Sequence, residues 1–208
     1  MSTAVLWMLT AWAAPPSTEA PACSGADARR ELVRHAKADQ RDRNQWVDDM
    51  ASRDAVRLAA VHRIVSEGRV CSGKSAFAAG VVLQHSAKRA DFALAHRMFR
   101  FAADEGVKGA ERWAALAWDR YLVSGGEPQW FGTQFQGQHA DDGAFLFQCL
   151  VAVDPESTDA DRIAIGALPL SERIAGVYRT NGKEIPSELT MDALEADGFV
   201  CEPVVWGE

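Results

Sequence analysis

Apolar residues recur every three or four positions over residues 26–124, the spacing that places side chains on one face of an α-helix. This pattern predicts a long helix followed by four more, over residues 26–50, 53–66, 75–87, 91–105 and 110–124. Gly68 and the pair Gly125-Gly126 lie just past two of these segments, where glycine commonly ends a helix. We expect these helices to pack against one another in pairs.

The helical period stops after the glycine pair. Residues 127–142 are rich in glycine, glutamine and aromatic side chains and predict an ordered loop or a short hairpin. The segments that follow are shorter: a buried strand over 145–153, short helices over 159–166, 171–179 and 190–196, and an extended end over 199–206. The predicted fold is mainly α: a single helical domain over residues 26–208, with a small irregular C-terminal part.

The first 25 residues resemble a signal peptide and linker. An apolar stretch over 4–14 precedes a segment rich in proline and small residues over 15–22. The stretch is shorter than the roughly 20 apolar residues that span a bilayer, and no Lys or Arg precedes it. We therefore expect export to the periplasm or the extracellular space. The alternative is a lipoprotein attached at Cys23, although the residues before Cys23 lack the leucine of a lipidation motif.

Composition excludes some functions. The chain has 208 residues, of which 48% are apolar and 25% charged, as in ordinary globular proteins. Its net charge of -7, with no basic segment, argues against binding nucleic acid. No phosphate-binding glycine loop is present, so we expect no nucleotide cofactor.

Neither the cysteines nor the histidines have metal-ligand spacing. The four cysteines include no C-x-x-C pair, and the five histidines include no H-x-x-x-H pair, so we expect no metal site. In an oxidising compartment the cysteines would form two disulfides with three possible connectivities. The alternative is that Cys149, within an apolar run, is simply a small buried side chain.

Two polar pairs interrupt apolar helical stripes. His85 follows Val81 and Val82 at helical spacing, and Asp119 follows Ala115 in the same way, so both side chains are predicted to point inward. Burying such groups without partners is costly, so we expect them to meet other polar groups. This meeting place is a candidate ligand site.

The functional interpretation makes His85 the general acid or base, because the ordinary pKa of histidine lies near neutrality, and makes Asp119 the group that fixes its tautomer. An arginine would hold an anionic group, and side chains of the loop over 127–142 would close over a small polar or anionic ligand. The ligand-binding residues are then predicted to be Arg43, Gln84, Arg120, Gln129, Thr133 and Gln134. The alternative is a purely structural cluster of salt bridges and hydrogen bonds. No serine stands in a nucleophile turn, so hydrolysis has little support.

Residues 90–106, which end in Ala-Ala-Asp-Glu-Gly, resemble the helix pairs of Sel1-like and tetratricopeptide repeat proteins. The unit occurs only once, whereas a solenoid needs about three or more. The resemblance therefore supports packing of helix pairs. It also suggests a rival function, a protein-interaction module with a protein partner at Trp130 and Phe131.

A second resemblance rests on a series of short motifs. The chain contains Asp39-Gln40-x-x-Arg43, Gln84-His85, Asp119-Arg120, Gln129-x-Phe131-Gly-Thr-Gln134, Asp161-Arg162 and the run 166–170. Together these motifs resemble a bacterial family known only as a domain of unknown function, over roughly residues 30–175. Phe131 stands where that family generally has tyrosine, which removes a hydroxyl group. The resemblance implies one helical domain with a shared polar site and adds no reaction.

Overall fold

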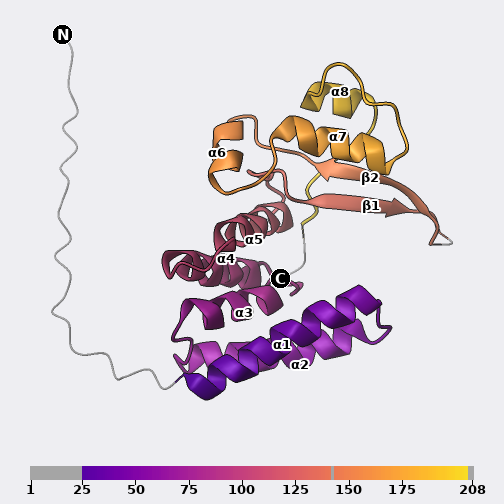
Figure 1. The fold of residues 1–208 in the computed structure, drawn as a ribbon. Coiled ribbons are helices and arrows are strands. Elements are labelled where there is room, and N and C mark those ends of the chain that lie inside the picture. The colour runs from indigo at the N-terminus through magenta and orange to yellow at the C-terminus, as the bar shows by residue number, and fades with distance from the viewer. Residues whose placement is uncertain (1–24, 142, 206–208) are drawn as a thin grey trace, which may run out of the picture.

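The computed structural model describes residues 25–141 and 143–205, and these fold into a mainly α structure, as predicted (Figure 1). The helices and strands stand in the order α1 (Ala26–Gln45), α2 (Met50–Ser66), α3 (Gly73–Leu83), α4 (Arg89–Asp104), α5 (Ala110–Ser124), β1 (Phe135–His139), β2 (Phe145–Val151), α6 (Asp159–Ala164), α7 (Leu170–Thr180), α8 (Met191–Ala196) and β3 (Val200–Cys201). Helices α1 and α2 lie side by side at one end of the molecule, and α3 to α5 stack against them. The sheet with α6 to α8 forms the other end.

The prediction of one long helix over residues 26–50 is wrong at its C-terminal end, because α1 ends at Gln45. The chain leaves the helix at Trp46, whose φ of 50° is left-handed and whose N–H binds the carbonyl of Arg43. The next helix begins at Met50 and not at the expected Arg53. Ser52, the expected cap, instead lies inside the first turn, where its hydroxyl donates to the carbonyl of Asp49. The apolar period continued through this break, so periodicity alone did not reveal it.

The helix α3 is the buried centre of the helical part. Ser72 caps it through a reciprocal pair of hydrogen bonds with Ser75, in which each hydroxyl accepts from the backbone N–H of the other residue. Gly80 allows α4 to approach closely, because a Cβ atom there would lie only 2.7 Å from the Phe99 ring. The surrounding core is made by the apolar faces of the first five helices and includes Leu32, Val61, Ile64, Val82, Leu83, Phe99 and Ala117.

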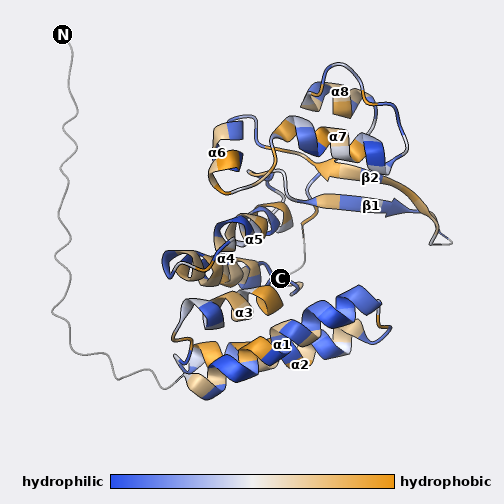
Figure 2. Ribbon diagram, viewed as in Figure 1, coloured by the Kyte–Doolittle hydropathy of each residue, from blue (hydrophilic) through white to orange (hydrophobic). Residues whose placement is uncertain are grey.

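The residues after α5 form a three-stranded sheet. β1 pairs antiparallel with β2, and β2 pairs parallel with β3. The segment 127–142 is therefore a loop followed by one strand, and its partner in the hairpin is the strand expected over 145–153. The central strand β2 is largely apolar and the edge strand β1 is more polar (Figure 2). A second core between the sheet, α7 and α8 contains Leu150, Ile174, Val177, Tyr178 and Leu194.

A disulfide bond ties β2 to β3. Cys149 of β2 is buried and bonded to Cys201 of β3, which closes a loop with a sequence separation of 52. Cys71 is also disulfide-bonded.

The expected signal peptide and linker, and the possible lipidation site Cys23, lie outside the described residues except for Gly25. Within the described ranges, no helix is both long and apolar enough to cross a membrane.

Candidate functional site

His85 lies in the turn after α3 and is paired with a carboxylate from α1. Its Nδ1 is 3.1 Å from Oδ1 and 3.0 Å from Oδ2 of Asp39, which is fully buried. Burial lowers the pKa of His85, and the hydrogen bond and charge of Asp39 oppose that shift. The neutral ring therefore donates its Nδ1 hydrogen to Asp39 and keeps a lone pair on Nε2. Nε2 has no partner among the described residues, and the side chain is 15% exposed.

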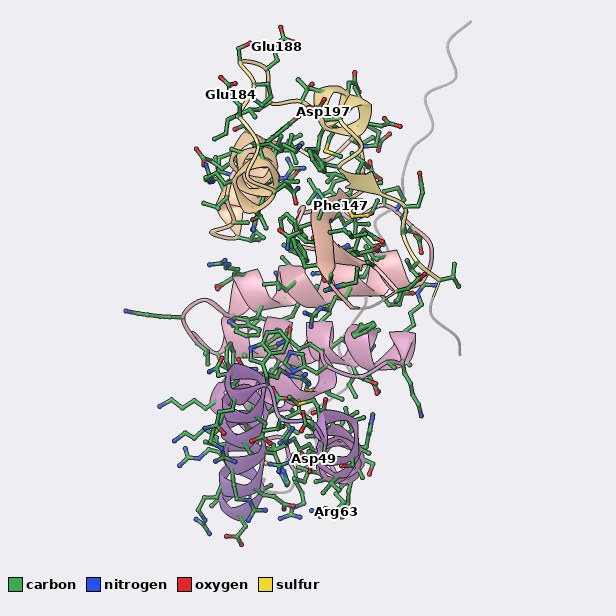
Figure 3. The ribbon with its side chains drawn as sticks, turned by 90° about the vertical axis from the view of Figure 1, so that its right-hand side faces the viewer. Asp49, Arg63, Phe147, Glu184, Glu188 and Asp197 are labelled. Atoms are coloured by element: carbon green, nitrogen blue, oxygen red, sulfur yellow. A yellow bond between two sulfur atoms is a disulfide. The ribbon has the colours of Figure 1, made fainter. Side chains whose placement is uncertain are left out.

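Asp39 also belongs to an ion-pair network that joins α1 to α2. It accepts from the side chains of Gln40 at 2.8 Å and Arg43 at 3.2 Å. Arg43 reaches on to Asp54 at 2.7 Å, and Arg57 bridges Asp54 to the buried Asp42. Figure 3 shows the charged side chains of these two helices, with Asp49 and Arg63 labelled, at the opposite end of the molecule from Asp197.

Arg120 is the second cationic residue near His85. Its Nη1 donates to the carbonyl of Gln84 at 2.6 Å, and its Nε donates to Oε1 of Gln134 at 3.2 Å. Burial lowers the pKa of Arg120 to about 10, helped by the charge of Arg43, yet the group stays charged at neutral pH. No carboxylate of the described chain forms an ion pair with it. In addition, Oε1 of Gln84 is buried and has no hydrogen-bond partner there.

Asp119 binds the loop after α5. Its oxygens accept from the backbone N–H groups of Trp130, Phe131 and Thr133 at 2.8 to 3.2 Å and from the Thr133 hydroxyl at 2.8 Å. Burial raises the pKa of Asp119, and these hydrogen bonds oppose the shift. Gly132, with a φ of +69°, makes the tight turn that directs the three N–H groups to one carboxylate.

The expectation that Asp119 fixes the tautomer of His85 is therefore wrong, and Asp39 occupies that position. The carboxylate of Asp119 is saturated by loop donors and does not bind the imidazole. Asp39 carried a signal that the motif-based argument missed. It follows Leu32 by seven residues and Ala36 by three, so it lies on the inward stripe of α1.

Gln129, Thr133 and Gln134 of the loop differ in the groups to which they hydrogen-bond. Gln129 is fully buried, and its amide spans the loop by binding the backbone of Gln134 and the carbonyl of Val151. Thr133 is held between Asp119 and the amide of Gln134. Both therefore stabilise the loop. Only Gln134 reaches Arg120.

The structure thus gathers the predicted residues into one continuous polar chain. Hydrogen bonds run from Asp119 through Thr133 and Gln134 to Arg120 and the carbonyl of Gln84. The next residue, His85, continues the chain into Asp39, Arg43 and α2. The groups with unused bonding capacity are His85 Nε2, Gln84 Oε1 and the charge of Arg120.

A groove of about 350 Å³ lies beside this chain. It is lined by mostly apolar side chains of α1 and α3, and it includes Gln40, whose amide binds Asp39. Among the described residues, no three His, Cys, Asp or Glu side chains are grouped so that they could hold a metal ion.

A family model described as a family of unknown function, DUF6624, matches residues 25–185. The resemblance to a family of unknown function is confirmed at that level, and the match spans the whole polar site. No curated protein and no solved structure matches the chain.

Proposed function

This chain belongs to the DUF6624 family, and we propose that its polar site binds a small anionic ligand that carries an O–H or N–H group. Arg120 holds the negative charge of the ligand, and Nε2 of His85 accepts the hydrogen and acts as general base. The observation that carries this proposal is the half-buried Arg120, whose guanidinium has no carboxylate partner among the described residues.

The charge argument comes from comparing the two arginines near His85. Arg43 is neutralised by Asp39 and Asp54. Arg120 is bound only by a carbonyl and an amide oxygen, which orient the guanidinium without neutralising it. A charge that is partly withdrawn from water is normally paired, so an anionic ligand is the partner that this arrangement favours.

The hydrogen-bond argument identifies the second group on the ligand. Gln84 Oε1 is buried without a donor, and the neighbouring His85 offers a lone pair on Nε2. An unpaired buried acceptor is destabilising, so a ligand O–H or N–H there satisfies it. Asp39 keeps the imidazole in the tautomer that can take a proton, as a general base requires.

The test is thermal unfolding of the full chain against hydroxy acids, amino acids, sugar acids and sulfated or phosphorylated small molecules. A ligand at a hundred times its Kd adds about 2.7 kcal/mol to the stability of the state that binds it. We expect a ligand that raises the unfolding midpoint of the wild type and of Arg97→Gln, an exposed control. The same ligand leaves Arg120→Gln unshifted and shifts His85→Gln less.

Catalysis is tested on the ligand found in this way. If that ligand reacts, His85→Gln lowers kcat by about a hundredfold or more while binding persists. A panel in which no ligand distinguishes Arg120→Gln from the control would favour the rival function, a Sel1-like protein-interaction module with a structural polar cluster. Trp130 and Phe131, the surface suggested for that module, are half-buried here.

The proposal includes export of the chain. The three cysteines of the described part, Cys71, Cys149 and Cys201, are all disulfide-bonded, and disulfides persist in oxidising compartments. The apolar stretch near the N-terminus is consistent with a leader. Mass spectrometry of the protein from its natural host is expected to find a cleaved N-terminus and no lipid on Cys23. An intact Met1 would contradict export by a cleaved leader, and a lipid on Cys23 would make the protein a lipoprotein.

A further inference from the structure

Three arginines from different helices interact electrostatically beside the loop that Asp119 holds. They are Arg112 of α5, Arg162 of α6 and Arg173 of α7. Arg173 lies under the loop, since a Cβ atom on Gly132 would be 3.9 Å from its Cγ. Burial lowers the pKa of Arg173, and the positive charges of Arg112 and Arg162 lower it further. None of the three has a part in the chain of hydrogen bonds that includes His85.

Two of these arginines have buried donors without acceptors. Nε of Arg162 and Nε of Arg173 are both buried and have no hydrogen-bond partner among the described residues. Arg162 is only 1% exposed, and its other nitrogens bind Asp159 at 3.1 Å and Ser157 at 2.5 Å. Buried N–H groups are normally paired, so unpaired Nε donors on two arginines whose charges repel each other favour the binding of an acceptor.

The charges around the cluster are also unbalanced. Arg112 and Arg173 form no ion pair with a carboxylate of the described chain. Asp119 is close enough to raise the pKa of Arg173, but the oxygens of Asp119 are taken by the loop. Asp159 is shared between Arg162 and the backbone N–H of Leu170. One anion in the cluster would relieve the repulsion and accept from the unused donors.

We infer that Arg112, Arg162 and Arg173 form a second ligand site, which binds a phosphate dianion, either free or as part of a small phosphomonoester. Guanidinium groups present planar pairs of donors that match phosphate oxygens, and three of them suit a dianion better than a singly charged carboxylate. Arg162 also belongs to the Asp161-Arg162 motif, which the site around His85 leaves unexplained.

The experiment is calorimetric titration of the full chain at pH 8, in a buffer free of phosphate, first with inorganic phosphate and then with glycerol phosphate. We expect wild type to bind at least one of them and Arg173→Gln to bind about tenfold more weakly or worse. Arg179→Gln is the matched control, because it removes the same charge from an exposed position on the same helix. Its affinity should change less than about twofold, since an exposed charge is screened.

The position of the site is tested by two further variants. Arg120→Gln should leave phosphate binding unchanged, because that residue belongs to the site around His85. If Arg173→Gln fails to fold, the exposed Arg112→Gln replaces it, with a weaker but measurable loss of affinity.

Three outcomes would overturn the inference. One is the absence of binding by either probe, and another is an equal loss in Arg179→Gln, which indicates diffuse attraction. The third is loss of binding in Arg120→Gln alone, which would instead place the phosphate beside His85 and support the first proposal.

Discussion

The imidazole of His85 donates to the buried carboxylate of Asp39 across 46 residues of sequence, and this bond joins α1 to the turn after α3. It orients the ring so that Nε2 keeps the lone pair. The same carboxylate anchors Arg43 and, through it, the helix α2. The position of the proposed general base therefore depends on the packing of the first two helices.

The first prediction concerns this bond. Asp39→Asn removes the negative charge that favours the imidazolium, so we expect the pKa of His85 to fall below its value in the wild type. The unfolding free energy should drop by about 1–3 kcal/mol, since Arg43 keeps only one of its two carboxylates. The measurement is an NMR titration of the ring nitrogens, with His85→Gln used to assign the signal.

Asp48→Asn is the control, because Asp48 is exposed in the turn between α1 and α2. It removes the same charge outside the buried network and should leave the His85 titration unchanged. An unaltered His85 pKa in Asp39→Asn would show that Asp39 does not set the protonation of the ring.

The second prediction concerns the loop. Asp119→Asn replaces an acceptor oxygen by an amide that cannot bind the N–H groups of Trp130, Phe131 and Thr133 together. We expect a loss of stability of about 3 kcal/mol, because buried donors lose a charged acceptor. Hydrogen exchange at the three amides should speed up selectively.

Thr133→Val separates the hydroxyl from the backbone contacts. It removes one of the bonds to Asp119 and should cost about 1 kcal/mol while the three amides stay protected. If Asp119→Asn leaves amide protection intact, the loop is held by Gln129 instead.

Helical periodicity was sufficient to predict most of the helical part. The helices α3 to α5 lie where apolar spacing and glycines placed them, within a few residues at each end. The break at Trp46 was missed because a left-handed tryptophan has no local signature, whereas glycine at such a position does. Strand β2 was predicted from its apolar run. Its parallel partner β3 is two residues long and depends on long-range pairing.

The sequence predicted most of the residues of the site but not which of them bind one another. Spacing indicates which side chains point inward, and it identified His85, Asp119 and Arg120 in this way. Which carboxylate meets which cation is decided by how helices cross, and that crossing is not encoded in any one helix. The sequence alone therefore does not tell whether Asp39 or Asp119 binds His85. In the structure Asp39 binds His85, and Asp119 binds the backbone N–H groups of the loop.

The third prediction concerns the disulfide. Cys149→Ala with Cys201→Ala opens a loop with a separation of 52, which corresponds to about 4 kcal/mol of lost stability in the chain-entropy estimate. Chemical denaturation of the double variant should show this loss. The loss should be concentrated in the sheet with α7 and α8, while the helical part keeps its amide protection. A loss below about 1 kcal/mol would mean that the pairing of β2 with β3 needs no covalent support.

The fourth prediction concerns pH. Burial holds the pKa of His85 below its ordinary value, so the folded protein binds fewer protons than the unfolded chain as the pH falls through about 6.5. The stability linked to His85 is thus complete above that pH and is lost as the pH falls toward the folded pKa. His35 contributes in the same direction, because burial also lowers its pKa.

Unfolding free energies measured between pH 7.5 and 5 show whether His85 makes the folded protein less stable or more stable as the pH falls. Wild type should lose stability with acidification more steeply than His85→Gln, and the double variant with His35→Gln should be the least sensitive. The lowered pKa of Asp39 acts only at more acidic pH, outside this window. If Asp39 instead held His85 as the imidazolium, the wild type would gain stability relative to His85→Gln as the pH falls. A base that is already protonated at neutral pH has no lone pair to offer a ligand, so that result would remove His85 from the proposed chemistry and leave Arg120 as an anion-binding residue alone.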